Sequence, residues 1–189
     1  MPALAELRGA APPLKAVYSR SEKSARELAK AAQITLNLET APLIYHDGDA
    51  SVNMDALLAR QDITIITIAL PILVQPDIIL KSLAAGKHVL SEKPIAPDVK
   101  TGLELISTYN QHYKNKGLVW RVGENYEAES GYRAAGAAIR SGKIGKVIFF
   151  KTLAVMYMDQ NSKWYKRPWR TVPDVSFSKY PLLFSVLSQ

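Results

Sequence analysis

The sequence has 189 residues, enough for one full hydrophobic core and the start of a second. Its 48% hydrophobic and 22% charged residues are typical of a globular protein, and no apolar run reaches the roughly 20 residues needed to span a bilayer. There is no cysteine, and the three histidines, His46, His88 and His112, are far apart, so we expect neither disulfides nor a metal site. The first residues carry no signal-peptide pattern, and we expect a cytoplasmic protein.

The net charge of +7 raises the question of nucleic-acid binding. Most basic residues are dispersed, and the densest cluster, residues 163–170, interleaves charge with tryptophan and tyrosine as single-strand binders do. That cluster is one short run without an accompanying nucleic-acid motif, and a phosphorylated small molecule accounts for the charge equally well. We therefore expect a small-molecule substrate, and neither a nucleic-acid nor a membrane partner.

Apolar, β-branched runs alternate with segments of helical periodicity, which is the pattern of an α/β fold with a parallel sheet. The segment 63–70 is apolar on both faces, so we expect this strand to be central and covered on both sides. A helix should follow Ser21, a suitable N-cap, and another should run from Pro76 in its first turn to Gly86. The other predicted elements are strands at residues 14–19, 43–45, 87–90 and 118–122 and a short helix around residues 54–58.

The second half predicts two more helices and a change of sheet. Pro97 can open a helix, whose apolar residues predict the inward face Val99, Leu103, Ile106 and Tyr113. A further helix presents Tyr132, Ala135 and Ile139 on one side, and residues 146–158 form a long β-rich run. We therefore predict a first domain over residues 1–126, the start of a second domain over 127–174, and a tail of no assigned structure over 175–189.

Polar residues follow several of the predicted strands, at residues 19–21, 91–94 and 124–126, and residues 69–71 end another. In open parallel sheets, ligands bind beyond the carboxyl ends of the strands. Lys93 at such a place can hold a substrate oxygen, or exchange a proton where burial lowers its pKa. The same residue also suits a solvated loop in which Pro94 merely ends the strand. The residue types alone leave both interpretations open.

The segment 86–94, GKHVLSEKP, closely resembles the "GKHVLxEKP" signature of the glucose-fructose oxidoreductase, inositol dehydrogenase and MocA (Gfo/Idh/MocA) family. The resemblance extends back through residues 68–71 and forward through 122–126 and 139–147, and covers roughly residues 1–174. It implies an NAD(P)-dependent oxidoreductase with a Rossmann domain followed by an open-sheet α/β domain, often acting on a sugar or polyol. It also implies that full-length relatives form homo-oligomers.

The same resemblance assigns the site residues. It places Lys93 near the nicotinamide and the substrate, as the catalytic residue. Glu92, close to the nicotinamide ribose, and Pro94 would shape the loop. Asn125 would line the same cleft. Ala69, Leu70 and Pro71 would bind the cofactor, with Pro71 near its adenosine or pyrophosphate side.

The choice of cofactor depends on the end of the strand at residues 14–19. An acidic residue there usually receives the ribose 2′-hydroxyl of NAD, whereas an arginine accommodates the 2′-phosphate of NADP. This chain has Ser19, Arg20 and Ser21 there, and no acid before Glu22. Hydroxyls and a guanidinium suit a phosphate, so we predict NADP, with NAD as the alternative. The competing interpretation is that Ser21 only caps a helix and Arg20 is a surface charge.

Two departures from the family pattern set the alternative function. No glycine-x-glycine-x-x-glycine turn occurs, and residues 1–9 resemble the helix that follows that turn, so the first strand and the phosphate-binding turn are expected to be missing. The fold class is then a Rossmann-type parallel sheet lacking its first strand, with an open position beside residues 14–19. The family's catalytic histidine would follow Asp174, where this chain has none, and Gln75 stands where the family often has a histidine. The alternative is therefore a catalytically inactive, truncated chain with residual nucleotide or partner binding.

Overall fold

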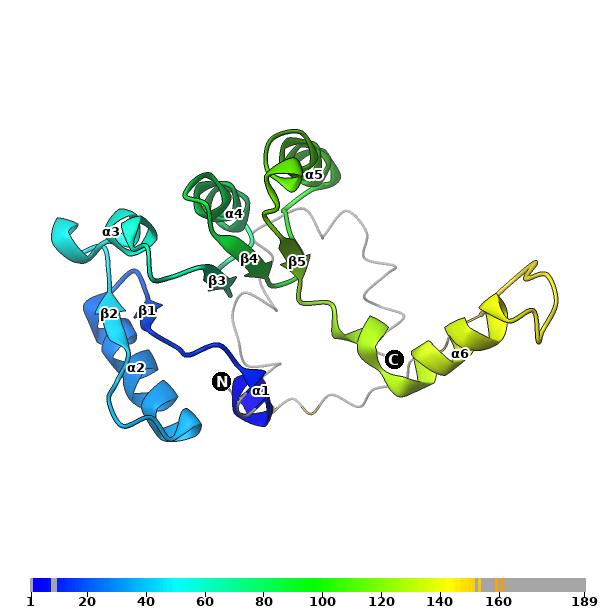
Figure 1. The fold of residues 1–189 in the computed structure, drawn as a ribbon, viewed down its shortest axis with the longest axis horizontal. Coiled ribbons are helices and arrows are strands. Elements are labelled where there is room, and N and C mark those ends of the chain that lie inside the picture. Colours follow the sequence, from blue (N-terminus) through cyan, green and yellow to red (C-terminus); the bar gives the residue numbers. More distant parts are fainter. Residues whose placement is uncertain (1, 8–9, 152, 154–158, 160, 162–189) are drawn as a thin grey trace.

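The computed structural model describes residues 2–7, 10–151, 153, 159 and 161. Strands and helices alternate through this part of the chain, as the sequence predicts (Figure 1). The strands are β1 (Ala16–Tyr18), β2 (Leu43–Tyr45), β3 (Ile65–Ile68), β4 (His88–Ser91) and β5 (Trp120–Val122). The helices are α1 (Pro2–Glu6), α2 (Glu22–Leu36), α3 (Met54–Ala59), α4 (Gln75–Ala84), α5 (Val99–His112) and α6 (Ser130–Arg140), with 3₁₀ turns at Ala50–Val52, Lys114–Lys116 and Asn125–Ala128.

All strand pairs are parallel, and they form two sheets. β1 pairs with β2 in the register Val17 to Ile44, and β4 lies between β3 and β5. Within the described residues β1 has no partner on its other edge, so the predicted open position beside this strand is confirmed. The α/β class with a parallel sheet is confirmed as well.

The helices lie in two layers. Figure 1 shows α3, α4 and α5 on one side of the strands and α1 and α2 on the other. The main core lies between α4, α5 and the three-stranded sheet, and consists of Ile68, Ile79, Leu83, Val89 and Leu105. A second cluster is centred on α3, with Met54, Leu57, Leu58 and Ile63.

The α3 cluster connects the two sheets. Tyr18 of β1 and Ile66 of β3 both pack against it. Next to it, Lys15 before β1 forms an ion pair of 3.1 Å with Asp62, which also binds Arg60 at 2.8 Å. The guanidinium of Arg60, and then the ammonium of Lys15, hold the pKa of the Asp62 carboxyl well below its usual range. Apolar packing and this charge cluster therefore hold the sheets together without strand pairing.

The local signals for helix ends are largely confirmed. Ser21 caps α2, because its side chain accepts a hydrogen bond from the Ser24 N–H. Pro76 lies in the first turn of α4, and Gly86 follows the end of that helix with φ of +76°, a conformation that glycine adopts without strain. Helix α5 differs by two residues, since Asp98 is its N-cap and Pro97 lies outside it.

One face of the three-stranded sheet is open, contrary to the prediction that residues 63–70 are covered on both sides. Ile68 is buried, but Ile65 is 46% exposed, and Leu90 and Val119 are also exposed. Successive right-handed crossovers from β3 to β4 to β5 place α4 and α5 on the same face, which is that of Ile68. No described residue buries the opposite face.

The predicted inward face of α5 is wrong except at Tyr113, which packs against the main core. Val99 and Leu103 are 78% and 62% exposed, whereas Gly102 and Leu105 are buried. Gly102 lies next to Ala96, whose Cβ would be 3.7 Å from a Cβ added at that glycine, an ordinary contact distance. The face of α5 that packs against the core is therefore the one with Gly102 and Leu105, which lies next to the predicted face.

The second-domain predictions receive limited support. Helix α6 forms, but none of its residues is buried, and Tyr132 is 50% exposed. The predicted strand over residues 146–158 does not form in its described part, residues 146–151, because a strand needs a partner and no described segment lies beside it. The basic aromatic cluster at 163–170 and the tail at 175–189 lie outside the described residues, and the domain boundary remains a prediction.

Candidate functional site

The carboxyl ends of β3, β4 and β5 are joined by backbone hydrogen bonds. The N–H of Glu92 donates to the Ile68 oxygen at 2.9 Å, and the N–H of Gly123 donates to the Ser91 oxygen at 2.7 Å. A Cβ at Gly123 would lie 3.5 Å from that same oxygen and 3.8 Å from the carboxyl carbon of Glu92. The loop after β5 therefore lies next to the loop after β4, at ordinary contact distance.

Lys93 lies in the centre of this edge and is exposed to solvent. Its N–H donates to the Glu92 carboxylate at 3.2 Å, and the bond between Lys93 and Pro94 is cis. Among the described residues Lys93 forms no ion pair, so its ammonium is available to a ligand. The sequence pattern placed Lys93 at a strand end, and the structure agrees.

Gln75, at the start of α4, holds the loop of residues 92–94 in place through two hydrogen bonds. Its side chain is buried, and the Nε2 amino group donates to the backbone oxygens of Glu92 at 3.0 Å and Pro94 at 2.7 Å. Sequence reasoning did not include Gln75 among the site residues. The available signal was its place in the family pattern, where a histidine is frequent.

The remaining residues predicted for this edge are present there but make fewer contacts. Ala69, Leu70 and Pro71 directly follow β3, and Pro71 is exposed. Asn125 begins the 3₁₀ turn two residues after Gly123 and is exposed. The structure therefore brings the segments after β3, β4 and β5 to one edge of a sheet.

The segment Ser19 to Ser21 lies at the carboxyl edge of the other sheet. The N–H of Ser19 donates to the Tyr45 oxygen at 3.1 Å, which continues the β1–β2 pairing by one residue. Arg20 and Ser21 are exposed. The Ser21 hydroxyl is engaged with Ser24, donating to its hydroxyl at 3.0 Å and accepting from its N–H at 3.3 Å. Capping therefore accounts for Ser21, while Arg20 is the available cation of the segment.

Sequence reasoning missed the acidic residue at this place, Asp47, which follows β2. The Tyr18 hydroxyl donates to Asp47 at 2.7 Å, and the Asp47 N–H donates to the Arg20 oxygen at 3.3 Å. Burial, followed by the hydrogen bond to Asp47, raises the pKa of Tyr18 to about 12, while the charge of Arg20 opposes the shift. Asp47 is 27 residues beyond Arg20 in sequence, so only the pairing of β1 with β2 reveals its proximity.

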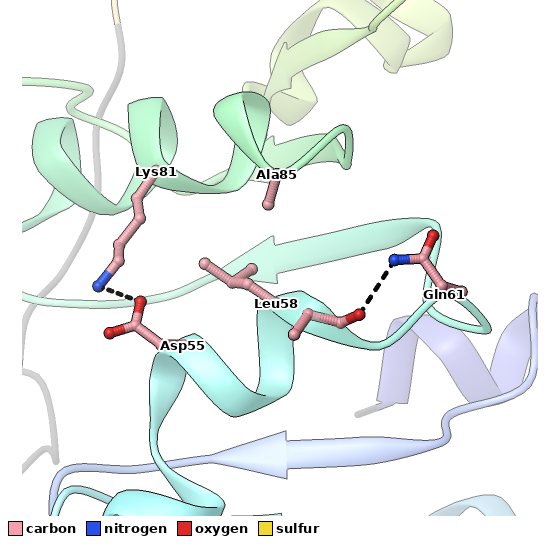
Figure 2. A pocket seen from close by; sticks show the side chains of 6 residues that line it. Asp55, Leu58, Gln61, Lys81 and Ala85 are labelled. Carbon is pink, nitrogen blue, oxygen red and sulfur yellow. Dashed lines mark hydrogen bonds and ion pairs between the residues drawn. The ribbon is translucent and has the colours of Figure 1, made fainter.

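His46 and the α3–α4 groove have structural explanations. His46 is buried, and its Nδ1 accepts a hydrogen bond from the Gly48 N–H at 3.1 Å. A hollow of about 350 Å³ lies beside α3 and α4, and Figure 2 shows the ion pair of Lys81 with Asp55, 2.6 Å long, that lines it. Its lining includes Lys81 and Ala85, which lie toward and just after the end of α4, whereas Gln75 begins that helix, so the hollow is separate from the Lys93 loop.

The described part of the chain offers neither a metal centre nor a membrane-spanning helix. No group of three or more histidine or acidic side chains there is arranged to hold a metal ion. Nor is any described helix long and apolar enough to cross a membrane.

Parallel strands alternating with helices that pack on the sheets, and loops gathered at the carboxyl ends of the strands, define an α/β nucleotide-binding domain of the Rossmann type. Residues 2–119 match the model of a family described as an oxidoreductase family with an NAD-binding Rossmann fold, Gfo/Idh/MocA. The chain belongs to this family.

Known proteins similar to the chain are oxidoreductases. Dehydrogenase FPY6 of Fusarium mangiferae is 38% identical over 164 residues, which are 85% of this chain and 44% of that protein. Levoglucosan dehydrogenase of Pseudarthrobacter phenanthrenivorans is 33% identical over 96 residues, which are 51% of this chain and 24% of that protein. This chain thus spans less than half the length of these relatives.

The solved structures similar to the chain include further oxidoreductases. The scyllo-inositol dehydrogenase of Lactobacillus casei, with bound NAD(H) and scyllo-inositol, matches 75% of this chain and 37% of that one, with a TM-score of 0.58 and 27% identity. An oxidoreductase of Thermotoga maritima matches 95% of this chain and 50% of that one, with a TM-score of 0.71 and 25% identity. The Rossmann-type fold is therefore established.

Proposed function

We propose that the protein is an NAD(P)-dependent oxidoreductase that transfers a hydride between a nicotinamide and an alcohol or carbonyl carbon of a sugar- or polyol-like molecule. The loop of Glu92 to Pro94 carries this proposal, because hydrogen bonds to Ile68 and Gln75 fix it at the edge where such sheets bind ligands. The family match and the inositol and levoglucosan dehydrogenases among the relatives support the substrate class.

The described residues fit the two ends of a dinucleotide. The donor set at the β4 edge, an exposed ammonium beside a carboxylate, suits the nicotinamide end, and the guanidinium of Arg20 suits the adenosine end. The sequence contains no glycine-rich turn to receive the pyrophosphate. The bound cofactor would supply or accept the hydride.

In this proposal Lys93 acts on the substrate oxygen. Its ammonium donates a hydrogen bond to that oxygen, and it holds or returns the proton as the oxygen changes between hydroxyl and carbonyl. Glu92 would lie close to the nicotinamide ribose of a bound cofactor, where a carboxylate can accept hydrogen bonds from hydroxyl groups. Asn125 would line the same cleft, and the segment after β3, residues 69–71, would contact the cofactor, with Pro71 on its adenosine or pyrophosphate side.

We further propose that NADP is preferred over NAD. Arg20 is exposed at the end of β1, where a guanidinium can bind a 2′-phosphate through two hydrogen bonds. Asp47 opposes this preference, because its carboxylate lies beside Tyr18 on the same edge. The preference for NADP over NAD therefore depends on the balance between the attraction of Arg20 and the repulsion of Asp47 for the 2′-phosphate.

The open edge of β1 favours a second candidate function. The strand that a complete Rossmann sheet has there, and the phosphate-binding turn after it, have no counterpart in the described residues. A chain without these elements would retain part of a nucleotide site, or bind a partner, without turnover.

A cytoplasmic location and homo-oligomeric assembly of the whole protein are further parts of the first proposal, and they rest on the family resemblance.

Titration of the purified chain with NADPH and NADH, followed by nicotinamide fluorescence, tests both candidates. We expect saturable binding that Arg20→Ala weakens for NADPH alone and that Lys93→Ala weakens for both. Arg133→Ala and Lys30→Ala, at exposed positions elsewhere, are matched controls. No saturable binding would refute the enzyme proposal for this chain, and turnover of a polyol or aldehyde would refute the inactive alternative. A salt-dependent interaction with single-stranded DNA is not expected.

A further inference from the structure

Gln75 is a buried polar side chain at the start of α4. It is 1% exposed and lies in the first turn of the helix, one turn before the buried core residue Ile79. The only hydrogen bonds of its side chain within the described residues are those from Nε2 to the oxygens of Glu92 and Pro94. Its Oε1 is buried and has no hydrogen-bond partner there. Burying an amide whose oxygen has no hydrogen-bond partner costs free energy. We therefore ask what the two hydrogen bonds of its amino group contribute.

A carboxamide matches the hydrogen-bonding groups of the loop at this position. Two backbone oxygens, on either side of Lys93, converge on one nitrogen, and a primary amide carries two N–H groups on that nitrogen. The reverse orientation of the amide would place its oxygen against two other oxygens, so the contacts fix the orientation. An imidazole has one N–H on each nitrogen and cannot serve both oxygens from one atom.

These two hydrogen bonds define the position of Lys93. They hold the backbone before and after it, at Glu92 and Pro94, to the rigid first turn of α4. On the β4 side the loop is anchored by the Glu92 N–H to Ile68 and by the Ser91 hydroxyl, which accepts from the Trp120 indole N–H at 3.0 Å. Without the amide, the oxygens of Glu92 and Pro94 would lose these partners and the loop would be held at one end only.

We propose that Gln75 is the positioning residue of the Lys93 loop, and that its two N–H groups fix the direction in which the Lys93 ammonium meets the substrate. The direction of the Lys93 ammonium toward the substrate rests on the proposed function, whereas the positioning of the loop concerns the chain without any ligand. Gln75 acts on the site through the backbone oxygens of Glu92 and Pro94, to which its amino group donates.

Three variants of the full chain test the inference. Gln75→Leu keeps the size of the side chain and removes both donors. Gln75→Glu places a carboxylate against two carbonyl oxygens at neutral pH and regains one donor when it is protonated, which burial shifts toward neutral pH. Gln111→Leu, on the exposed face of α5, is the control. Amide hydrogen exchange of residues 91–98 is measured in each, together with NADPH affinity.

We expect Gln75→Leu to lower the exchange protection of residues 91–98 about tenfold or more, with protection of the β4 residues 88–90 unchanged. Gln75→Glu should show the same loss at pH 8 and recover part of it at pH 5.5, which a merely destabilised fold would not do. NADPH affinity should fall in parallel, by about tenfold at pH 8. The control variant should behave as the wild type.

Equal protection of the loop in wild type and Gln75→Leu would overturn the inference, and so would a Gln75→Glu variant whose protection does not depend on pH. The exchange experiment needs no cofactor, so failure of the wild-type chain to bind NADPH would count against the proposed function alone. Loss of loop protection without any change in a measurable NADPH affinity would overturn the role of Gln75 at the site.

Discussion

The hydroxyl of Tyr18 donates a hydrogen bond of 2.7 Å to the carboxylate of Asp47, across the carboxyl ends of β1 and β2. This contact places a negative charge at the edge where Arg20 supplies a positive one. A dianionic 2′-phosphate would be attracted by the second and repelled by the first. Cofactor preference is therefore a property of the two strands together.

Replacing Asp47 with asparagine should increase the preference for NADP. The amide oxygen still accepts the hydrogen bond from Tyr18, so the change removes a charge and little else. We expect NADPH affinity to rise about fivefold, the effect of a partly solvated charge, while NADH affinity changes less than twofold. Fluorescence titration at low and high salt measures both, and the gain should shrink at high salt. Unchanged NADPH affinity would show that the phosphate does not approach Asp47.

The same pair predicts a dependence of stability on alkaline pH. Burial and the hydrogen bond to Asp47 raise the pKa of Tyr18 to about 12, against about 10 in the unfolded chain. The folded state thus favours the neutral phenol, and this contribution is complete below pH 10 and disappears as the pH rises toward 12. The free energy of unfolding in urea should fall more steeply between pH 10 and 12 for the wild type than for Tyr18→Phe. An equal fall of the unfolding free energy in the wild type and in Tyr18→Phe would contradict a raised pKa of Tyr18 in the folded state.

The two lysines of the signature segment 86–94 have different tasks. Lys87 is 4% exposed, and its ammonium donates to the Arg60 backbone oxygen at 2.6 Å, which connects β4 to the loop before β3. Lys93 is exposed at the other end of the strand. Replacing Lys87 with methionine retains the apolar stem and should cost about 2 kcal/mol, or a melting temperature lower by about 4–8 °C. Lys93→Ala should leave the melting temperature unchanged.

Cofactor titration completes that comparison. Lys87→Met should bind NADPH as the wild type does at a temperature where both are folded, whereas Lys93→Ala should bind it more weakly. Calorimetry and fluorescence on the same samples separate the two effects. A loss of NADPH affinity in Lys87→Met without a loss of stability would contradict the structural role of Lys87.

The sequence predicted the order and type of the elements as far as α6, because strand and helix periodicities and the capping signals at Ser21, Pro76 and Gly86 are local. It also placed Lys93 at a strand end. It failed where the answer depends on segments distant in the chain. Asp47 reaches Tyr18 only through strand pairing, and the burial of Gln75 depends on a loop 17 to 19 residues away.

The face of α5 was mispredicted for a related reason. Both its stripes contain apolar residues, so periodicity alone does not choose between Leu103 and Leu105. Tyr109 settles the choice, since its hydroxyl donates to the Leu118 oxygen at 3.0 Å and its ring meets Trp120 edge to face, with centroids 5.5 Å apart. Leu105 lies one turn earlier on the same stripe and is buried.

Alanine substitution on the two stripes of α5 tests this orientation. Leu105 is 2% exposed, and its loss should leave a cavity that costs about 2–5 kcal/mol. Leu103 is 62% exposed, and its replacement should change stability by less than about 0.5 kcal/mol. Urea unfolding of both variants, followed by Trp120 fluorescence, measures the difference. Similar losses in the two variants would mean that the exposed stripe with Leu103 and Ile106 is also packed against protein in solution, and would locate an interface on α5.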